Sequence, residues 1–372
     1  MNLLSRASRI VIKVGSSLLA GEERKPRARW LATLAEDVAA LRAEGKHIII
    51  VSSGAVALGR DRLCVGGRKL KLAEKQAAAA CGQTALIEAW QAAFAPHKLH
   101  VAQVLLTLED SDNRRRYLNA RDTLETLLAA GVIPVINEND TVATAELRFG
   151  DNDRLAARVA QMTGAEVLIL LSDVDGLYTA NPRTDKKAKH IPEVPAITPE
   201  IEAFAGGIGS DVGSGGMVTK IAAARIATAS GCHLLVVLGL PEHPIAALSA
   251  GARHTHFRAL DNPENARRAW LSHKLSVAGE VVVDDGALAA LKKGKSLLPA
   301  GVQEVRGNFE RGDAVAILSG AGKEIGRGLA AFHSEDARQV IGKKSADFPE
   351  HLRGLGRDEM IHRDDMVLLD DR

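Results

Sequence analysis

The stretch Ile10-Val-Ile-Lys-Val-Gly-Ser-Ser17 is a short apolar run that carries one lysine and ends in a glycine and two serines. It lacks the strict alternation of apolar and polar residues that marks a strand with one solvent-exposed face, so it is typical of a strand covered on both faces. Similar runs recur along residues 1–240: Ile48–Ser52, Val101–Leu106, Val132–Ile136, Val167–Leu171 and Leu234–Leu238. We therefore predict a mostly parallel sheet that contains these strands.

Longer segments with a helical pattern lie between these runs: Arg27–Glu44, Ala73–Phe94, Asn113–Ala130, Asn152–Met162 and Val218–Ser230. In the fourth segment, Leu155, Val159 and Met162 repeat at the i, i+4, i+7 spacing of one helical face. Strands that alternate with helices predict an α/β fold. The expected architecture is a three-layer α/β/α domain around the mostly parallel sheet.

The chain changes character after Pro263, where short strand candidates are punctuated by glycine and proline. These candidates are Gly279–Val283, Ser296–Pro299, Gln303–Val305, Ala314–Leu318 and Gly328–Phe332. A length of 372 residues suggests roughly two domains. We predict a first domain at 1–260, a linker at 261–277, a small β-rich domain at 278–356 and a tail at 357–372.

The composition is that of an ordinary globular protein, with a formal net charge of +2. So small a charge argues against nucleic acid or a membrane surface as the main partner. Cys64, Cys81 and Cys232 form no CxxC pair, which argues against a disulfide framework or a zinc site. Basic residues interrupt the N-terminal apolar stretch and no apolar run is long enough to span a bilayer. We therefore expect a cytoplasmic protein.

Lys13 has two interpretations. A lysine inside an apolar strand is costly unless its ammonium reaches a partner. It stands near the carboxyl end of the first strand, where open parallel sheets bind ligands, and Gly15 allows a phosphate to approach the backbone. Alternatively, Lys13 reaches out to water from an edge strand. The local sequence does not separate the two.

Two polar motifs follow predicted strands. Ser52-Ser-Gly-Ala55 either caps the next helix or offers N–H groups to an anion. Asn137-Glu-Asn-Asp140 places four polar side chains in succession, which is more than a turn needs. A polar substrate with an ammonium group would use them.

Two further motifs carry acids near turns. In Gly150-Asp-Asn-Asp-Arg154, Asp151 or Asn152 would cap a helix and Asp153 would be a first-turn acid. One such residue is ordinary capping, whereas three in a row favour a functional site. Ser172-Asp173 ends another strand before an Asp-Gly turn. It is either plain turn structure or a contact to adenine or ribose.

The segment Gly206–Lys220 contains six glycines and closes on a lysine where a helix is predicted. A flexible linker has this composition, but the lysine at a helix start favours phosphate binding. No G-x-x-x-x-G-K-[ST] motif is present, and no G-x-G-x-x-G follows the first strand, which disfavours a dinucleotide dehydrogenase. The histidines lack the spacing of metal ligands.

Taken in order, these motifs resemble the amino acid kinase family. The set consists of Lys-x-Gly-x-Ser, Ser-Ser-Gly-Ala, Asn-Glu-Asn-Asp, Gly-Asp-Asn-Asp, Ser-Asp-x-x-Gly-Leu-Tyr and Gly-Gly-Met-x-Thr-Lys. Asn-Glu-Asn-Asp and Tyr117–Thr123 resemble the members that phosphorylate the γ-carboxylate of L-glutamate, the first step of proline biosynthesis. The end of the chain resembles their C-terminal PUA domain. The resemblance runs from about residue 8 to 367, and Ser172 departs from it because threonine is frequent there.

The resemblance implies roles for single residues. Lys13 and Lys220 would flank the transferred phosphoryl group, and Asp153 would orient both lysines. The substrate would be held by Ser53, Asn137, Asp140, Asp151 and Asn152. The nucleotide would be held by Lys13, Gly15, Ser172, Asp173, Ser214, Gly215, Gly216, Met217, Val218, Thr219 and Lys220. The resemblance further implies ATP and Mg²⁺, feedback inhibition by proline, and a homo-oligomer that is a dimer or a tetramer.

Two alternatives are open. One is a kinase of the same fold that acts on acetylglutamate, aspartate or a nucleoside monophosphate, which the Asn-Glu-Asn-Asp motif and the tail disfavour. The other is RNA binding, since PUA domains often bind RNA. Between Gly279 and Gly342 eight Lys and Arg stand against nine Asp and Glu, a net charge of −1. An RNA-binding surface is expected to be basic, so RNA binding is disfavoured.

Overall fold

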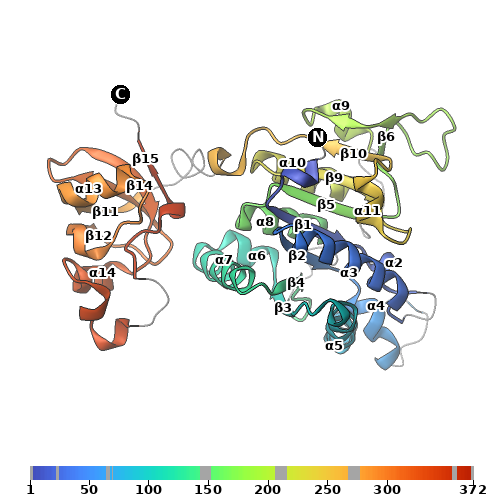
Figure 1. The fold of residues 1–372 in the computed structure, drawn as a ribbon, viewed down its shortest axis with the longest axis horizontal. Helices are drawn as coiled ribbons and strands as arrows, with labels where there is room; N and C mark the ends of the chain where they lie inside the picture. Colours follow the sequence, from blue (N-terminus) through green and yellow to red (C-terminus); the bar gives the residue numbers. More distant parts are fainter. Residues whose placement is uncertain are drawn as a thin grey trace. The chain divides into compact units, whose positions relative to one another are not determined.

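The computed structural model describes residues 3–21, 25–63, 68, 70–142, 152–205, 216–266, 277–353 and 358–369. The chain divides into two compact units, Met1–Pro263 and Glu264–Arg372 (Figure 1). Each unit has its own sheet and its own apolar core. The domain boundaries expected from the sequence remain a prediction.

The first unit contains an eight-stranded sheet with the order β3-β4-β2-β1-β5-β9-β10-β8. Neighbouring strands are parallel except β9 and β10, so the predicted mostly parallel sheet is confirmed. Its strands are β1 Arg9–Val14, β2 His47–Ser52, β3 Val101–Leu106, β4 Ile133–Glu138, β5 Val167–Ser172, β8 Glu193–Val194, β9 His233–Leu238 and β10 His254–Phe257. A separate hairpin pairs β6 Leu177–Tyr178 with β7 His190–Ile191.

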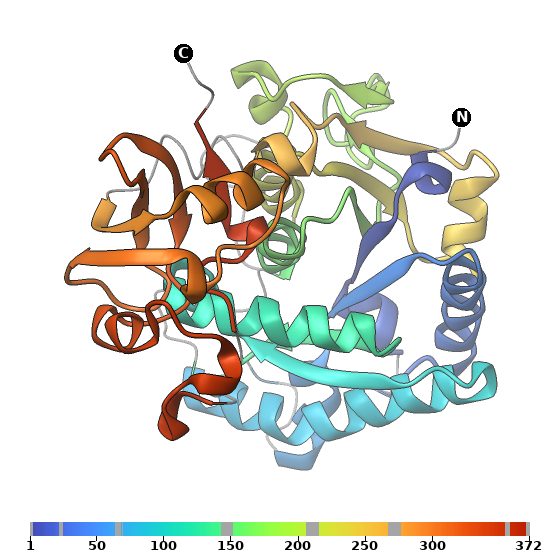
Figure 2. The same cartoon turned by 60° about the vertical axis from the view of Figure 1, so that its left-hand side comes forward.

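Helices cover both faces of this sheet. One face packs against α3 (Ala28–Ala43), α4 (Ala55–Gly59), α5 (Leu72–Phe94) and α11 (Pro244–Ser249). The other packs against α7 (Arg114–Ala129), α8 (Asn152–Thr163) and α10 (Met217–Ala229). Figure 2 shows the edge strand β3, in cyan, between α5 and α7. The shorter helices are α1 Leu3–Arg6, α2 Ser16–Leu19, α6 Leu108–Asp112 and α9 Pro199–Ala203. The three layers are confirmed, and each of the five predicted helices lies within one residue of its expected ends.

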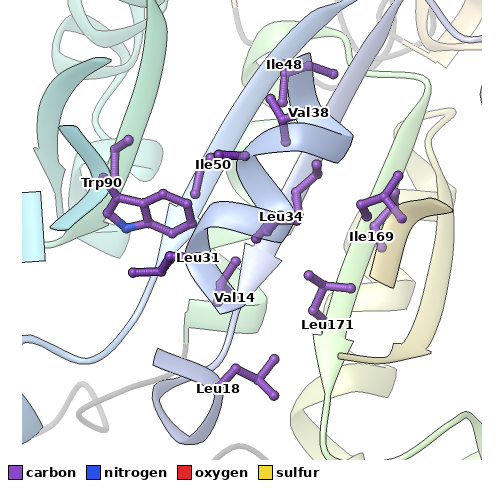
Figure 3. Close-up of a cluster of buried hydrophobic side chains, with 14 of the residues drawn as sticks. Val14, Leu18, Leu31, Leu34, Val38, Ile48, Ile50, Trp90, Ile169 and Leu171 are labelled. Atoms are coloured by element: carbon purple, nitrogen blue, oxygen red, sulfur yellow. The ribbon is translucent and has the colours of Figure 1, made fainter. Parts of the chain in front are cut away.

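The alternation of side chains along β1 explains why both faces need cover. Ile10, Ile12 and Val14 belong to the core beneath α3, whereas Val11 belongs to the core beneath α8 and α10. Figure 3 shows the first core, in which Leu31 and Leu34 of α3 lie over the strands. Burying each such side chain contributes about 1.5–3 kcal/mol. The odd-numbered residues of β1, including Lys13, therefore point toward α8.

Two glycines bring α4 directly against α5. A Cβ at Gly59 would stand 1.8 Å from the carbonyl oxygen of Ala78, and one at Gly82 would stand 1.8 Å from that of Ala55. Only glycine permits this approach, because real Cβ atoms do not come so close to backbone atoms. The contact places α4, and with it the turn that carries Ser53, beside the end of the sheet.

The second unit has a five-stranded sheet with the order β12-β11-β13-β14-β15. Its elements are β11 Val277–Val283, α13 Asp285–Lys292, β12 Val302–Gly307, β13 Ala314–Ser319, β14 Glu324–Leu329, α14 Ser334–Val340 and β15 Met366–Leu368. The predicted small β-rich unit is confirmed, and α13 and α14 are helices that the glycine and proline punctuation obscured.

Two strand predictions in this unit are wrong in detail. Ser296–Pro299 forms no strand, because Leu297 makes only an isolated bridge to Ile361 and Pro299 starts a 3-10 turn. The strand expected at Gly328–Phe332 lies earlier, at Glu324–Leu329, where it pairs with β13. Cross-strand pairing sets these limits, and pairing is not visible in local sequence.

The register of the first sheet gathers the strand ends at one edge. Val14 of β1 pairs with Ser52 of β2 and with Leu171 of β5. Since β2 and β5 flank β1 on opposite sides, the strand order reverses there. Ligands of open parallel sheets bind at the carboxyl ends of the strands beside such a reversal. The fold therefore points to the end of β1 as the site.

Candidate functional site

Two lysines share one carboxylate at this edge. Lys13 Nζ, at the end of β1, lies 2.6 Å from Asp153 Oδ1. Lys220 Nζ, in the first turn of α10, lies 3.3 Å from Asp153 Oδ2. Asp153 comes from the first turn of α8, so three elements meet here. The tertiary structure thus joins residues that are up to 207 positions apart.

The three side chains of this cluster are almost completely buried. Lys13, Lys220 and Asp153 are exposed to only 6%, 4% and 1%. Burial alone would raise the pKa of Asp153, but the two lysines outweigh it and lower that pKa to about 2. Burial also lowers the pKa of Lys220, although Asp153 counters part of that effect. With all three groups ionised, the cluster carries one excess positive charge, which favours an anion.

The start of α10 adds backbone donors to the same place. Gly216 is the N-cap, and a Cβ built on it would meet nothing within 4 Å. The Thr219 hydroxyl lies 2.8 Å from Asp153 Oδ2 and 2.8 Å from the carbonyl oxygen of Gly216. Met217 and Val218, also in this first turn, are half-buried. Helix N-termini carry unpaired N–H groups and a partial positive charge, so they suit phosphate.

A second polar group lies on the other side of β1. Asn152 Nδ2 donates hydrogen bonds to Ser53 Oγ at 2.8 Å and to Asn137 Oδ1 at 3.2 Å. Asn152 Oδ1, the other polar atom of this side chain, is buried and has no hydrogen-bond partner among the described residues. An unsatisfied buried acceptor is costly unless a ligand supplies a donor. The arrangement fits a ligand with N–H groups.

Asp140 is a buried carboxylate two residues beyond the end of β4. Burial, together with the nearby carboxylate of Glu138, raises the pKa of Asp140 to about 7. Asn137 and Glu138 belong to strand β4 itself, rather than to the segment after it as the sequence suggested, because both pair with β3. A cationic group of a ligand would stabilise the ionised form of this buried carboxylate, because an opposite charge nearby favours ionisation.

Ser172 and Asp173 lie at the end of β5, on the side of β1 away from β2. Ser172 Oγ donates to Asp173 Oδ1 at 3.2 Å, and Arg183 lies 3.1 Å from Asp173 Oδ2. Partial burial opposes the charge of Asp173, but the hydrogen bond from Arg183 helps to lower its pKa. The pair combines a hydroxyl and a carboxylate, which suits ribose or base hydroxyl and amino groups.

Gly15 borders the lysine cluster. A Cβ built on it would meet nothing closer than 3.8 Å, and Lys13 Nζ would lie 3.9 Å away. Its φ of −74° is open to any residue. Neither backbone strain nor crowding by the described residues therefore requires glycine here. The missing side chain instead leaves room beside the ammonium of Lys13, as a bound phosphate would need.

Comparison with known proteins identifies the chain. The sequence profile described as the amino acid kinase family matches residues 8–238, which hold every site residue described above. This chain belongs to the amino acid kinase family. A PUA domain profile matches residues 279–352, in the second unit.

Two relatives of this amino acid kinase that align over nearly the whole chain are both named glutamate 5-kinase. Glutamate 5-kinase of Paramagnetospirillum magneticum is 56% identical over 369 residues, covering 99% of this chain and 100% of the relative. Glutamate 5-kinase of Sinorhizobium fredii is 52% identical over 365 residues, covering 98% and 93%. Among solved structures, UMP kinase from Ureaplasma parvum matches with a TM-score of 0.46 and 15% identity, covering 68% of this chain and 99% of that chain.

The kinase fold brings most of the sequence-predicted site residues to one edge. Asp151, Ser214 and Gly215 lie outside the described residues. Sequence reasoning missed Glu138 and Arg183, which act on Asp140 and Asp173. Glu138 stood inside a motif already singled out, whereas Arg183 is ten residues from Asp173 and carries no local signal.

The described residues lack two further features. No group of three or more His, Cys, Asp or Glu there is arranged to hold a metal ion. No helix in the same part of the chain is both long and apolar enough to cross a membrane.

Proposed function

We propose that this amino acid kinase transfers the γ-phosphoryl group of ATP to the γ-carboxylate of L-glutamate, the first step of proline biosynthesis. The observation that carries the proposal is the buried Lys13–Asp153–Lys220 cluster with its excess positive charge. Relatives named glutamate 5-kinase, more than half identical over nearly the whole chain, support the choice of glutamate.

The chemistry needs little beyond position and charge. A carboxylate is already a nucleophile near neutral pH, so the γ-carboxylate oxygen forms the new bond to phosphorus without a general base. The bond between phosphorus and the bridging oxygen breaks, and ADP leaves with the electron pair. Charge on the phosphoryl oxygens must be neutralised meanwhile. Lys13 and Lys220 do this, because each is an ammonium group that carries a positive charge and three N–H donors.

Asp153 keeps both ammonium groups in place before the nucleotide arrives. Two like charges in a dry site repel, and the carboxylate between them offsets this repulsion. Because Asp153 is already ion-paired through both oxygens, it is a positioning group rather than a base. Preorganised donors of this kind avoid reorganisation during the reaction.

Glutamate would bind on the β2–β4 side. Asp140 and Asn152 Oδ1 are buried acceptors and would take the α-ammonium group. Acetylglutamate has an uncharged amide in place of this ammonium, so the same acceptors disfavour it. We extend the proposal to Asp151, which belongs to the same motif as Asn152 in the sequence.

The nucleotide would bind on the β5 side, with its phosphates toward Gly15, Lys13 and the start of α10. Ser172 and Asp173 would contact its adenosine part, and the adjoining Ser214 and Gly215 would complete the phosphate contacts. Mg²⁺ would arrive bound to the phosphates and neutralise part of their charge.

Regulation and assembly complete the proposal. Proline is proposed as a feedback inhibitor at or near the glutamate site, because it shares the ammonium and carboxylate of the substrate. A cytoplasmic homo-oligomer, dimer or tetramer, is proposed from the family resemblance. A structural or regulatory role is proposed for the PUA domain, in view of its balanced charge.

The test is ADP release with glutamate, acetylglutamate, aspartate and UMP, each with and without proline. Glutamate should be the productive acceptor, and hydroxylamine should trap its acyl phosphate as the hydroxamate. ADP release that depends on another acceptor, with none from glutamate, would replace the proposal with that substrate. Sizing by light scattering tests the oligomer, and salt-sensitive RNA retention by the full chain would argue for the RNA alternative.

A further inference from the structure

The Thr219 hydroxyl faces two acceptors with one proton. Asp153 Oδ2 and the carbonyl oxygen of Gly216 each lie 2.8 Å from Thr219 Oγ1. We expect the hydroxyl proton to point to the carboxylate, because a hydrogen bond to an ionised acceptor is stronger than one to a neutral carbonyl oxygen. Thr219 therefore connects the first turn of α10 to the carboxylate between the two lysines.

The two oxygens of Asp153 are used differently. Oδ1 is 2.6 Å from Lys13, whereas Oδ2 is 3.3 Å from Lys220 and also accepts from Thr219. The Lys13 contact is thus the tighter of the two ion pairs. Thr219 helps satisfy Oδ2, so Lys220 is not the sole donor to that oxygen.

We infer that Thr219 is a positioning residue of the phosphoryl-transfer site. Its hydroxyl holds Asp153 Oδ2, sets the rotation of the carboxylate, and keeps Lys220 directed to the phosphoryl group instead of collapsed onto Asp153. This inference rests on the proposed function, since it concerns the same reaction. It differs from the role that the family resemblance implies for Thr219, which is direct contact with the nucleotide.

The two roles predict different kinetics. A hydroxyl that binds nucleotide contributes to affinity, so its removal raises the ATP KM and the Kd for ADP. A hydroxyl that positions Asp153 and Lys220 acts when charge develops on the phosphoryl group. Its removal lowers kcat and leaves the Kd for ADP unchanged.

The experiment compares Thr219→Val, Thr219→Ala and Thr219→Ser in the full chain. We expect kcat to fall about 10- to 100-fold in the Val and Ala variants, the effect of losing one hydrogen bond to a charged group. Glutamate KM and the Kd for ADP, measured by calorimetry, should stay within about twofold of wild type. Serine keeps the hydroxyl and should restore most of the turnover.

Thr228→Val is the matched control. Thr228 lies on the same helix and is buried, and its hydroxyl donates to the carbonyl oxygen of Ala224 at 2.8 Å rather than to a carboxylate. This variant shows how much kcat changes when a threonine hydroxyl that does not contact Asp153 is removed from α10. It should leave kcat within about twofold of wild type, even if the unfolding temperature drops.

Several outcomes would overturn the inference. Unchanged kcat in both Val and Ala variants would do so, as would a weaker Kd for ADP with kcat retained, which would make Thr219 a nucleotide ligand. A Ser variant as slow as Val would assign the effect to the methyl group. If Val does not fold, Ala carries the test. A wild-type chain without glutamate-dependent ADP release would instead refute the proposed function.

Discussion

Asp153→Asn should destabilise the protein strongly, because it leaves two buried ammonium groups without their carboxylate. The pKa of about 2, against an ordinary 3.8, corresponds to about 2 kcal/mol of stabilisation of the charged form. Removing one partner of a buried ion pair typically costs about 3–5 kcal/mol. We therefore expect the free energy of unfolding to fall by roughly 2–5 kcal/mol at neutral pH.

The effect has a defined pH dependence. The folded pKa of Asp153 is depressed, so its stabilisation is fully present above the ordinary value near 3.8. It is lost as pH falls through the folded value of about 2. The free energy of unfolding of Asp153→Asn should therefore lie below that of wild type by a constant amount between pH 5 and 7, roughly 2–5 kcal/mol. This difference should become smaller in stronger acid.

Urea unfolding with and without ADP provides the assay. The variant site carries two excess positive charges instead of one, so ADP should stabilise Asp153→Asn at least as much as wild type. Turnover should nevertheless fall, because the two lysines lose their shared anchor. A variant as stable as wild type at pH 7 would refute the reasoning, since the lysines would then need no counter-charge.

Further predictions concern single positions. Lys220→Ala and Lys13→Ala should each lower kcat about 10²–10³-fold with smaller changes in substrate binding, measured by steady-state kinetics. Asp140→Asn should raise the glutamate KM. Burial raises the pKa of Asp140 to about 7, so its ionised form, which predominates at pH 8, lowers the free energy of unfolding of the wild type. The same variant should therefore unfold in more urea than wild type at pH 8 and not at pH 4. Gly15→Ala should keep the unfolding temperature, because its Cβ would make only ordinary contacts of 3.8 Å or more with the described residues. It should raise the ATP KM, because the methyl group would stand beside the ammonium of Lys13, where we propose that phosphate binds. Gly59→Ala should lower stability by about 3 kcal/mol or more, seen by thermal unfolding, because α4 and α5 must separate.

Each of these has a clear contrary result. Near-full turnover in either lysine variant contradicts the two-lysine mechanism. An unchanged glutamate KM in Asp140→Asn removes that residue from the substrate site. An unchanged ATP KM in Gly15→Ala contradicts phosphate binding there, and a stable Gly59→Ala variant contradicts the close packing of α4 on α5.

The fold was predictable where local pattern decides it. The buried runs of the first unit form neighbouring strands and the amphipathic segments form helices, because covered strands are short continuous apolar runs whereas amphipathic helices repeat at the helical period. The second unit was predicted less well. Ser296–Pro299 looks like a strand but makes one bridge, because no neighbouring strand pairs with it.

The site was predictable as a set of residues and not as a geometry. Local sequence left Lys13 undecided between a solvated edge lysine and a phosphate ligand. The structure places it 2.6 Å from Asp153, on a central strand. Arg183, the partner of Asp173, had no signal in the sequence because the contact forms only after the turn folds.

By itself the sequence determined the α/β class, the β-rich second unit and the identity of the charged residues, since hydrophobic period and residue chemistry are local properties. Only the tertiary structure decided that Lys13 and Lys220 share Asp153 and that Thr219 donates to the same carboxylate. It also decided that the buried Asn152 Oδ1 has no hydrogen-bond partner among the described residues. The physical reason is that strand order and register bring distant chain segments to one edge of the sheet. Because these groups are buried there, the pKa of each one depends on the charges of its neighbours.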